Sequence, residues 1–249
     1  MILLRSFVFN VGFFVGTLFL MIVFLPALIV GRRALPWCGR VWARMLRWWL
    51  AVGIGVRIEI RGEVPSGPCL IAAKHQSAWE TIEFFRLLPD ACFVLKRELV
   101  WIPMLGWYIA RNRQIVINRS AGASALKRML AEVELALAAG RQIVVFPQGT
   151  RVAPGVKRPY QSGIGFLSNH LDVRVIPVAL NSGVVWGRNK FVKCPGTIVL
   201  EFLKPMPEGL GSRVFIEELS TRIELASQRL AVEGRQSIRR PRKGGVMSC

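Results

Sequence analysis

The sequence is short of acidic residues, histidines and paired cysteines. Its 249 residues contain 15 Asp and Glu against 34 Lys and Arg, and no acidic residue precedes Glu59. Only two histidines occur, and His170 is interpreted as structural or exposed, which leaves His75 as the one of interest. The five cysteines are scattered and contain no Cys-x-x-Cys pair. This pattern predicts reduced thiols facing the cytoplasm, without a disulfide framework and with no metal site.

Motifs of several other protein classes are missing as well. No Gly-x-Ser-x-Gly sequence presents a nucleophilic serine, so we do not expect an acyl-enzyme intermediate. No helix-turn-helix, RRM or zinc pattern accompanies the net charge of +19. Because 52% of the residues are hydrophobic, that charge favours a protein at an anionic bilayer surface. We expect no nucleic-acid partner, and a membrane-tethered basic binding protein stays open as the alternative class.

The N-terminal region has the composition of a membrane-embedded segment. Residues 6–31 contain no charged side chain, which is long enough to cross a hydrocarbon core of about 30 Å. Pro26 also suits a bent or re-entrant helix. The arginines that follow place the next part of the chain in the cytoplasm by the positive-inside rule; they are Arg32, Arg33, Arg40, Arg44 and Arg47. We therefore predict N-terminal membrane-associated helices over residues 1–55.

From residue 56 onward, short β-branched runs alternate with helical patterns. Alternation of this kind predicts an α/β fold with a mostly parallel central sheet covered by helices. The predicted strands are 56–60, 69–73, 93–95, 114–118, 142–146, 173–179 and 197–202, and the main predicted helices are 78–85, 122–139, 162–171 and 213–232. The predicted domain spans residues 56–232, followed by a basic, disordered tail over residues 233–249.

The segment 69–85 places a histidine and an acid around a turn from strand to helix. On a continuous helix, residues five apart point about 140° away from each other. His75 and Glu80 therefore meet only if His75 lies in the turn before the helix. The Glu80 carboxylate then accepts a hydrogen bond from Nδ1–H of His75 and leaves Nε2 free as a base. A capping turn with an incidental carboxylate is the alternative interpretation.

A second polar segment directly follows the predicted strand 142–146. In the sequence FPQGTR, residues 146–151, a glycine turn can present backbone N–H groups to an anion, and Arg151 can add a guanidinium contact. The predicted strand 114–118 also ends beside a basic residue, Arg119. For the FPQGTR segment, a plain turn with a solvated arginine is the alternative.

Four blocks in this order resemble the glycerolipid acyltransferase family, and more narrowly the 1-acyl-sn-glycerol-3-phosphate acyltransferases. The family's Asn-His-x4-Asp block corresponds to residues 74–80, and its strand block ending in arginine corresponds to residues 114–119. Its FPEGTR block appears here as FPQGTR, and its Val-Pro-Val block as residues 176–178. The resemblance implies a glycerol-3-phosphate acyltransferase-like fold with a membrane-embedded N-terminal helical segment.

The resemblance also implies an activity and roles for individual residues. His75 is expected to be the general base and Glu80 its orienting acid, with backbone N–H groups at the start of the following helix as oxyanion donors. The expected phosphate-binding residues are Arg119, Gly149, Thr150 and Arg151, with Lys96 as a weaker candidate. The implied reaction moves an acyl group from acyl-CoA or acyl-carrier protein to lysophosphatidic acid, giving phosphatidic acid without a cofactor. The implied location is the membrane, with the catalytic domain on the cytoplasmic face of a bacterial inner membrane.

Three residues depart from the family pattern. Glu80 replaces the usual Asp, and Gln148 replaces a Glu whose charge is expected to order Thr150 or Arg151. Lys74 replaces an Asn and is expected to add positive charge beside the base. These departures leave open another lyso-lipid acceptor, such as lyso-ornithine lipid. The sugar head of a lipid A precursor is a further alternative, against which the FPQGTR sequence argues.

Overall fold

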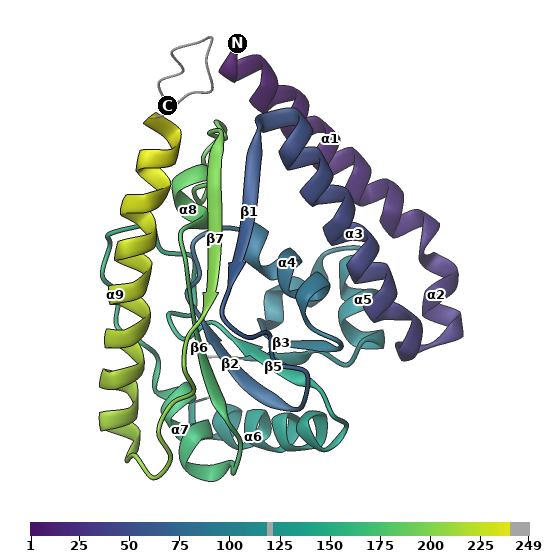
Figure 1. The fold of residues 1–249 in the computed structure, drawn as a ribbon. Helices are drawn as coiled ribbons and strands as arrows, with labels where there is room; N and C mark the ends of the chain where they lie inside the picture. Colours follow the sequence, from purple (N-terminus) through teal and green to yellow (C-terminus); the bar gives the residue numbers. More distant parts are fainter. Residues whose placement is uncertain (119–121, 240–249) are drawn as a thin grey trace.

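The computed structural model describes residues 1–118 and 122–239, and within them seven strands form one sheet (Figure 1). The strand order is β1-β7-β6-β2-β5-β3-β4. Every neighbouring pair is parallel except β6 and β7. The predicted mostly parallel sheet is therefore confirmed. The strands are β1 (Val56–Arg61), β2 (Cys69–Ala73), β3 (Ala91–Lys96), β4 (Ile115–Ile117), β5 (Gln142–Val145), β6 (Val175–Leu180) and β7 (Gly196–Phe202).

The central strand β2 is buried on both faces. Ile71 and Ala73 belong to one hydrophobic cluster, whereas Leu70 and Ala72 belong to another. Because successive side chains of a strand point to opposite faces, these two clusters are the two layers of core above and below the sheet. This is why β2 has a continuous apolar sequence and no polar alternation.

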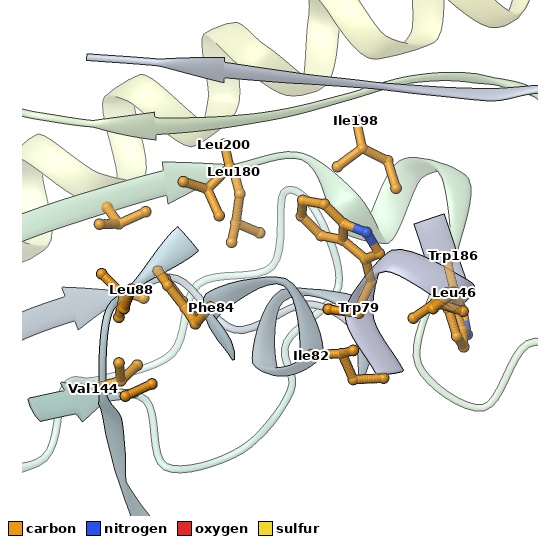
Figure 2. Packing of buried hydrophobic residues seen from close by; sticks show 14 of the residues in the cluster. Leu46, Trp79, Ile82, Phe84, Leu88, Val144, Leu180, Trp186, Ile198 and Leu200 are labelled. Atoms are coloured by element: carbon orange, nitrogen blue, oxygen red, sulfur yellow. The ribbon is translucent and has the colours of Figure 1, made fainter. Parts of the chain in front are cut away.

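One face of the sheet is covered by the N-terminal helices and by α4 (Trp79–Leu87). Figure 2 shows Trp79, Ile82 and Phe84 of α4 within the packed layer that also contains Leu180 and Leu200. Trp79 is 1% exposed. This burial fixes the first turn of α4 against the sheet.

The opposite face is covered by α6 (Gly122–Ala138), α7 (Ser162–His170) and α9 (Ser212–Arg239). Helix α9 runs along the sheet and buries Leu219, Ile223 and Leu230 (Figure 1). It continues seven residues beyond the predicted end at residue 232. Of the predicted tail, residues 240–249 lie outside the described residues. Further short helices are the α-helices α5 (Leu105–Arg111) and α8 (Ser182–Val185), the 3-10 helices η1 (Arg32–Ala34) and η3 (Arg97–Trp101), and the π-helix η2 (Leu50–Ile54).

The N-terminal region is a bent helical hairpin. Helix α1 (Ile2–Val23) breaks at Phe24 and is followed by α2 (Leu25–Val30), and α3 (Leu35–Trp49) then runs back beside α1 (Figure 1). Pro26 occupies the first turn of α2, where its missing N–H costs nothing. Helix α1 is long and apolar enough to cross a membrane, and 17% of its apolar window is buried. An N-terminal helix of this kind indicates membrane association.

Close contacts hold α1 to the rest of the protein. The indole Nε1 of Trp49 donates to the carbonyl of Phe9 at 3.1 Å. A Cβ at Gly12 would lie 2.6 Å from the Trp49 ring, so only glycine permits this approach. Phe9 is fully buried against Trp186, and the Ser6 hydroxyl accepts a hydrogen bond from the backbone N–H of Lys193 at 3.0 Å. Helix α1 is therefore part of the core as well as an apolar surface.

Candidate active site

Three neighbouring parallel strands end at the same edge of the sheet. They are β6, β2 and β5, which are adjacent in the strand order. The residues after them are Asn181 and Ser182, the turn 74–78, and the loop 146–161. Carboxyl ends of parallel strands are where α/β proteins place ligands. The sequence blocks at residues 74–80 and 146–151 thus meet at one edge, together with the strand end that follows the block at residues 176–178.

His75 and Glu80 are in direct contact. Nδ1 of His75 lies 2.8 Å from Oε1 of Glu80. Helix α4 begins at Trp79, so His75 lies in the turn before it and Glu80 in its first turn, as the spacing predicts. Because a carboxylate oxygen accepts, Nδ1 carries the proton and Nε2 is the basic nitrogen. The predicted geometry is present, and the catalytic roles of the two residues stay predictions.

The Glu80 carboxylate also organises the turn that carries His75. Its Oε1 accepts the backbone N–H groups of Gln76 at 2.6 Å and of Ser77 at 2.7 Å. Its Oε2 accepts the hydroxyl of Ser182 at 2.7 Å. Glu80 is fully buried, so these donors replace the water that a carboxylate requires. The capping turn and the oriented histidine, which the sequence left as alternatives, are both present.

These contacts bear on the expected oxyanion donors. The amides of Gln76 and Ser77 point to Glu80, and the amide of Trp79 donates to Ser77 Oγ at 3.1 Å. While these bonds are intact, these three N–H groups do not fit that role. Of these three residues only Trp79 lies in α4, so the expectation of oxyanion donors at the start of that helix stays a prediction for its other N–H groups.

The imidazole of His75 is supported on its flat face. It stacks on Phe146, with ring centroids 3.9 Å apart and an interplanar angle of 16°. The carbonyl of His75 accepts the backbone N–H of Val152 at 2.8 Å. Its side chain is 14% exposed, so the ring reaches the surface while its orientation is fixed. The FPQGTR loop is therefore directly beside the base.

The predicted phosphate-binding residues have different outcomes. Gly149 adopts a φ of 69°, as a glycine turn requires. A further guanidinium, that of Arg188, donates to Thr150 Oγ1 at 3.3 Å and to the carbonyl of Arg151 at 3.2 Å. Lys96 ends β3 at the same sheet edge, on the far side of β5 from β2. Arg119 lies outside the described residues. Phosphate binding by this set stays a prediction.

Lys74 does not place its charge beside His75. The Lys74 side chain extends to the face of the sheet that α9 covers, where its ammonium pairs with Glu224 at 2.6 Å. Gln148 faces the same carboxylate, with its Nε2 3.4 Å from Glu224 Oε1. The expectation of an added positive charge beside the base is therefore wrong, because Glu224 balances that charge on the other face of the sheet.

Sequence reasoning missed Ser182, Arg188 and Glu224. Ser182 follows the predicted strand 173–179, so the sheet-edge rule could have identified it. Glu224 is a carboxylate within the apolar stripe of α9, which is a visible irregularity. Its partners are up to 150 residues away in the sequence, and nothing local indicates them. No group of three or more metal-ligating side chains occurs in the part of the chain that the structure describes.

Comparison with known proteins identifies relatives of this chain. A family model described as Acyltransferase matches residues 55–181. The 1-acyl-sn-glycerol-3-phosphate acyltransferase of Pseudomonas aeruginosa is 37% identical over 186 residues, covering 74% of this chain and 72% of that protein. The 1-acyl-sn-glycerol-3-phosphate acyltransferase alpha of Mus musculus is 30% identical over 132 residues, covering 51% of this chain and 46% of that protein. The crystal structure of the 1-acyl-sn-glycerophosphate acyltransferase of Thermotoga maritima has the same fold, with a TM-score of 0.73 at 21% identity over 94% of this chain and 97% of that one.

Proposed function

Because the chain belongs to the acyltransferase family, we propose that it acylates the sn-2 hydroxyl of 1-acyl-sn-glycerol-3-phosphate to give phosphatidic acid. The observation that carries this proposal is the oriented His75–Glu80 pair at 2.8 Å, directly beside the FPQGTR loop. The identity of the Pseudomonas aeruginosa relative supports the choice of acceptor.

The proposed chemistry is direct transfer from a thioester. Nε2 of His75 removes the proton from the acceptor hydroxyl as its oxygen attacks the thioester carbonyl carbon. The tetrahedral intermediate then collapses, the C–S bond breaks, and the departing thiolate takes the proton back from the imidazolium. General base catalysis of this kind contributes about 10²–10⁴-fold. Glu80 holds the imidazole in the tautomer that this cycle needs and stabilises its charged form.

The acceptor phosphate is assigned to the loop that follows β5. The guanidinium groups of Arg151 and Arg188 are both carried by or bound to this loop, and they suit a phosphate dianion by charge and geometry. Thr150 adds a hydroxyl, and Lys96 and Arg119 are further candidates from neighbouring strand ends. The acyl donor is either acyl-CoA or acyl-carrier protein. Both are acidic, and the net charge of +19 attracts both.

A bilayer location follows from the substrates and from the N-terminal hairpin. Acceptor and product are both lipids, so the site has to work at a membrane surface. The apolar surface of α1 supplies the attachment, and the arginines after it favour the cytoplasmic face, which in a bacterium is that of the inner membrane.

The test is acyl transfer by the purified full-length protein in mixed micelles. The acceptors are lysophosphatidic acid, lyso-ornithine lipid and neutral lyso-lipids, each with acyl-CoA and with acyl-carrier protein. We expect transfer to lysophosphatidic acid, and a loss of about 10²–10⁴-fold in His75→Ala. Activity on lyso-ornithine lipid alone would show that this lipid, and not lysophosphatidic acid, is the acceptor. Undiminished transfer by His75→Ala would overturn the mechanism.

A further inference from the structure

A buried cluster lies behind the two loops of the site, on the face of the sheet that α9 covers. At its centre the Glu224 carboxylate accepts hydrogen bonds from three side chains. The ammonium of Lys74 donates to Oε1 at 2.6 Å and to Oε2 at 2.7 Å. The Tyr160 hydroxyl donates to Oε1 at 3.0 Å, and the Gln148 amide donates to it at 3.4 Å. One carboxylate thus holds three side chains that come from two loops.

The three donors occupy informative places in the chain. Lys74 is the residue directly before His75, and Gln148 directly precedes Gly149. Tyr160 is close to the end of the loop 146–161, which the bond from Gln161 N–H to the Pro147 carbonyl closes at 2.8 Å. Glu224 therefore contacts the turn that carries His75 and both ends of the loop 146–161.

Burial makes these contacts interdependent. Lys74 and Gln148 are each 1% exposed. Burial lowers the pKa of Lys74 from its usual value, and the hydrogen bond that its ammonium donates to Glu224 opposes this shift. Burial, followed by the adjacent Glu224 charge, raises the pKa of Tyr160 well above its ordinary value, so its hydroxyl stays a donor. Without the carboxylate, a buried ammonium would have no counter-charge, which proteins do not tolerate well.

We propose that Glu224 is a positioning residue for acyl transfer: it fixes the His75 turn and the FPQGTR loop relative to each other through Lys74, Gln148 and Tyr160. The inference rests on the proposed function. The same two loops also meet around His75 itself, through the His75–Phe146 stack and the Val152–His75 hydrogen bond. Glu224 connects the His75 turn to the FPQGTR loop a second time, on the face of the sheet that α9 covers. Small displacements of reacting groups cost large factors in rate, so the connection acts on catalysis.

The primary test compares Glu224→Gln with Leu219→Ala in the full-length protein. Glu224→Gln keeps the size of the side chain and removes its charge. Leu219 is a fully buried residue of the same helix, whose truncation creates a cavity without removing any of the hydrogen bonds to Glu224. Both variants are assayed well below their unfolding midpoints. We expect kcat to fall about 10- to 100-fold in Glu224→Gln and to stay within about twofold of wild type in Leu219→Ala.

Rescue provides a readout that a merely structural role would not give. In the double variant Gln148→Glu with Glu224→Gln, the carboxylate moves across the 3.4 Å contact from the helix to the loop. The cluster keeps its charge and its hydrogen bond between positions 148 and 224. We expect this variant to recover most of the lost kcat. Equal losses in Glu224→Gln and Leu219→Ala, or activity of Glu224→Gln within twofold of wild type, would overturn the proposal.

A second variant covers the case in which Glu224→Gln does not fold. Lys74→Met with Glu224→Met replaces the buried ion pair by apolar side chains, an exchange that proteins often tolerate without loss of stability. It removes the connection without leaving a lone charge. We expect a folded protein with kcat reduced about 10-fold or more. A folded double variant with wild-type kcat would contradict the positioning role of Glu224.

The proposed function is checked separately in the same assay. If wild type acylates no lyso-lipid, the proposed function fails, and the positioning role is decided by amide hydrogen exchange alone. In that measurement we expect faster exchange over residues 74–78 and 146–161 in Glu224→Gln but not in Leu219→Ala. Unchanged exchange in both loops contradicts the role of Glu224 whatever the activity.

Discussion

Two carboxylates, the fully buried Glu80 and the partly buried Glu224, organise the same sheet edge from opposite faces. Glu80 lies in the first turn of α4 and takes two of its four donors from the backbone of the preceding turn. Glu224 lies in the middle of α9, and its carboxylate accepts hydrogen bonds from the side chains of Lys74, Gln148 and Tyr160, which belong to distant loops. The first carboxylate orients an ionisable ring that reaches the surface, whereas the second balances an ammonium that never does.

The contrast separates local from long-range positioning. Contacts between residues 75, 76, 77 and 80 follow from the geometry of a single turn, so they form whenever α4 forms. Contacts of Glu224 require that β2, β5 and α9 are already packed together. We call Glu80 the front carboxylate and Glu224 the back carboxylate. We expect the front carboxylate to govern the chemistry of the base, and the back carboxylate to govern the alignment of the two loops.

The largest effect is expected when the front carboxylate is altered. Glu80→Gln keeps the side-chain volume, but an amide oxygen is a weaker acceptor than a carboxylate, and its NH₂ group is a donor that faces other donors. The imidazole then loses its defined tautomer, and kcat should fall about 10²–10⁴-fold. Initial rates of acyl transfer measure this, with thermal unfolding as a check on the fold.

The control for Glu80→Gln is Glu217→Gln. Glu217 lies on α9, its side chain is 65% exposed, and it forms an ion pair with the exposed Arg213. Wild-type rates are expected for it, because exposed pairs of this kind contribute little. Glu80→Gln with more than a tenth of the wild-type kcat would mean that the front carboxylate is a cap and nothing more.

Lys193 shows how burial changes the pKa of an ammonium whose hydrogen bonds go to carbonyls and not to a carboxylate. Lys193 is 3% exposed, and its ammonium donates to the carbonyls of Lys190 at 2.7 Å and Phe191 at 3.0 Å. Burial lowers the pKa of Lys193 to about 8. Between about pH 8 and 10.5 the unfolded chain therefore binds more protons than the folded one, and the free energy of unfolding rises with pH.

Lys193→Met isolates this contribution. Chemical unfolding at pH 7 to 10.5 should show the stability of wild type rising relative to the variant by about 3 kcal/mol. This is most of the pKa difference between 10.5 and about 8, converted at 1.36 kcal/mol per unit, because the unfolded chain is only half deprotonated at pH 10.5. The thiols that also titrate in this range are common to both proteins and cancel. A constant difference across the range would show that the folded protein keeps Lys193 charged as easily as the unfolded chain does.

The smallest effect is expected at the link between the front carboxylate and β6. Ser182→Ala removes one donor from Glu80 Oε2 and leaves the other three. A hydrogen bond to a charged group contributes about 1.5–3 kcal/mol, and the lower end of this range, expected because three donors remain, lowers kcat about 10-fold. Ser227→Ala is the matched control on α9, since its hydroxyl accepts a long 3.4 Å bond from Leu180 N–H. Equal rates for the two variants would contradict a role for Ser182.

The fold could be predicted largely from the sequence because its strands are short, apolar and bounded by clear turns. Strand β2 was predicted with both of its ends, and β1 and β7 to within one residue. The His75–Glu80 contact was also predictable, because helix geometry permits only one way for residues five apart to meet. Residues of the N-terminal segment left two possibilities, and the break at Phe24 with its returning α3 corresponds to the bent one.

The back of the site could not be predicted, for a physical reason. Lys74 was interpreted by its neighbour in the sequence, His75, whereas its ammonium pairs with Glu224 of α9 and the His75 ring contacts Glu80 of α4 on the other face. Gln148 was interpreted as a missing charge, although the charge is present 76 residues away at Glu224. Partners at such separations follow only from the packed arrangement of α9.

The way α1 is built into the core has a practical consequence for preparing this protein. Deleting the leading helix is a common route to a water-soluble version of a membrane enzyme. Here the cut would remove Phe9 from beneath Trp186 and Ser6 from the amide of Lys193. Trp186 directly follows α8, the short helix that begins with Ser182. A shortened protein would thus be expected to lose activity through the Ser182–Glu80 hydrogen bond, even in detergent, where no bilayer is needed.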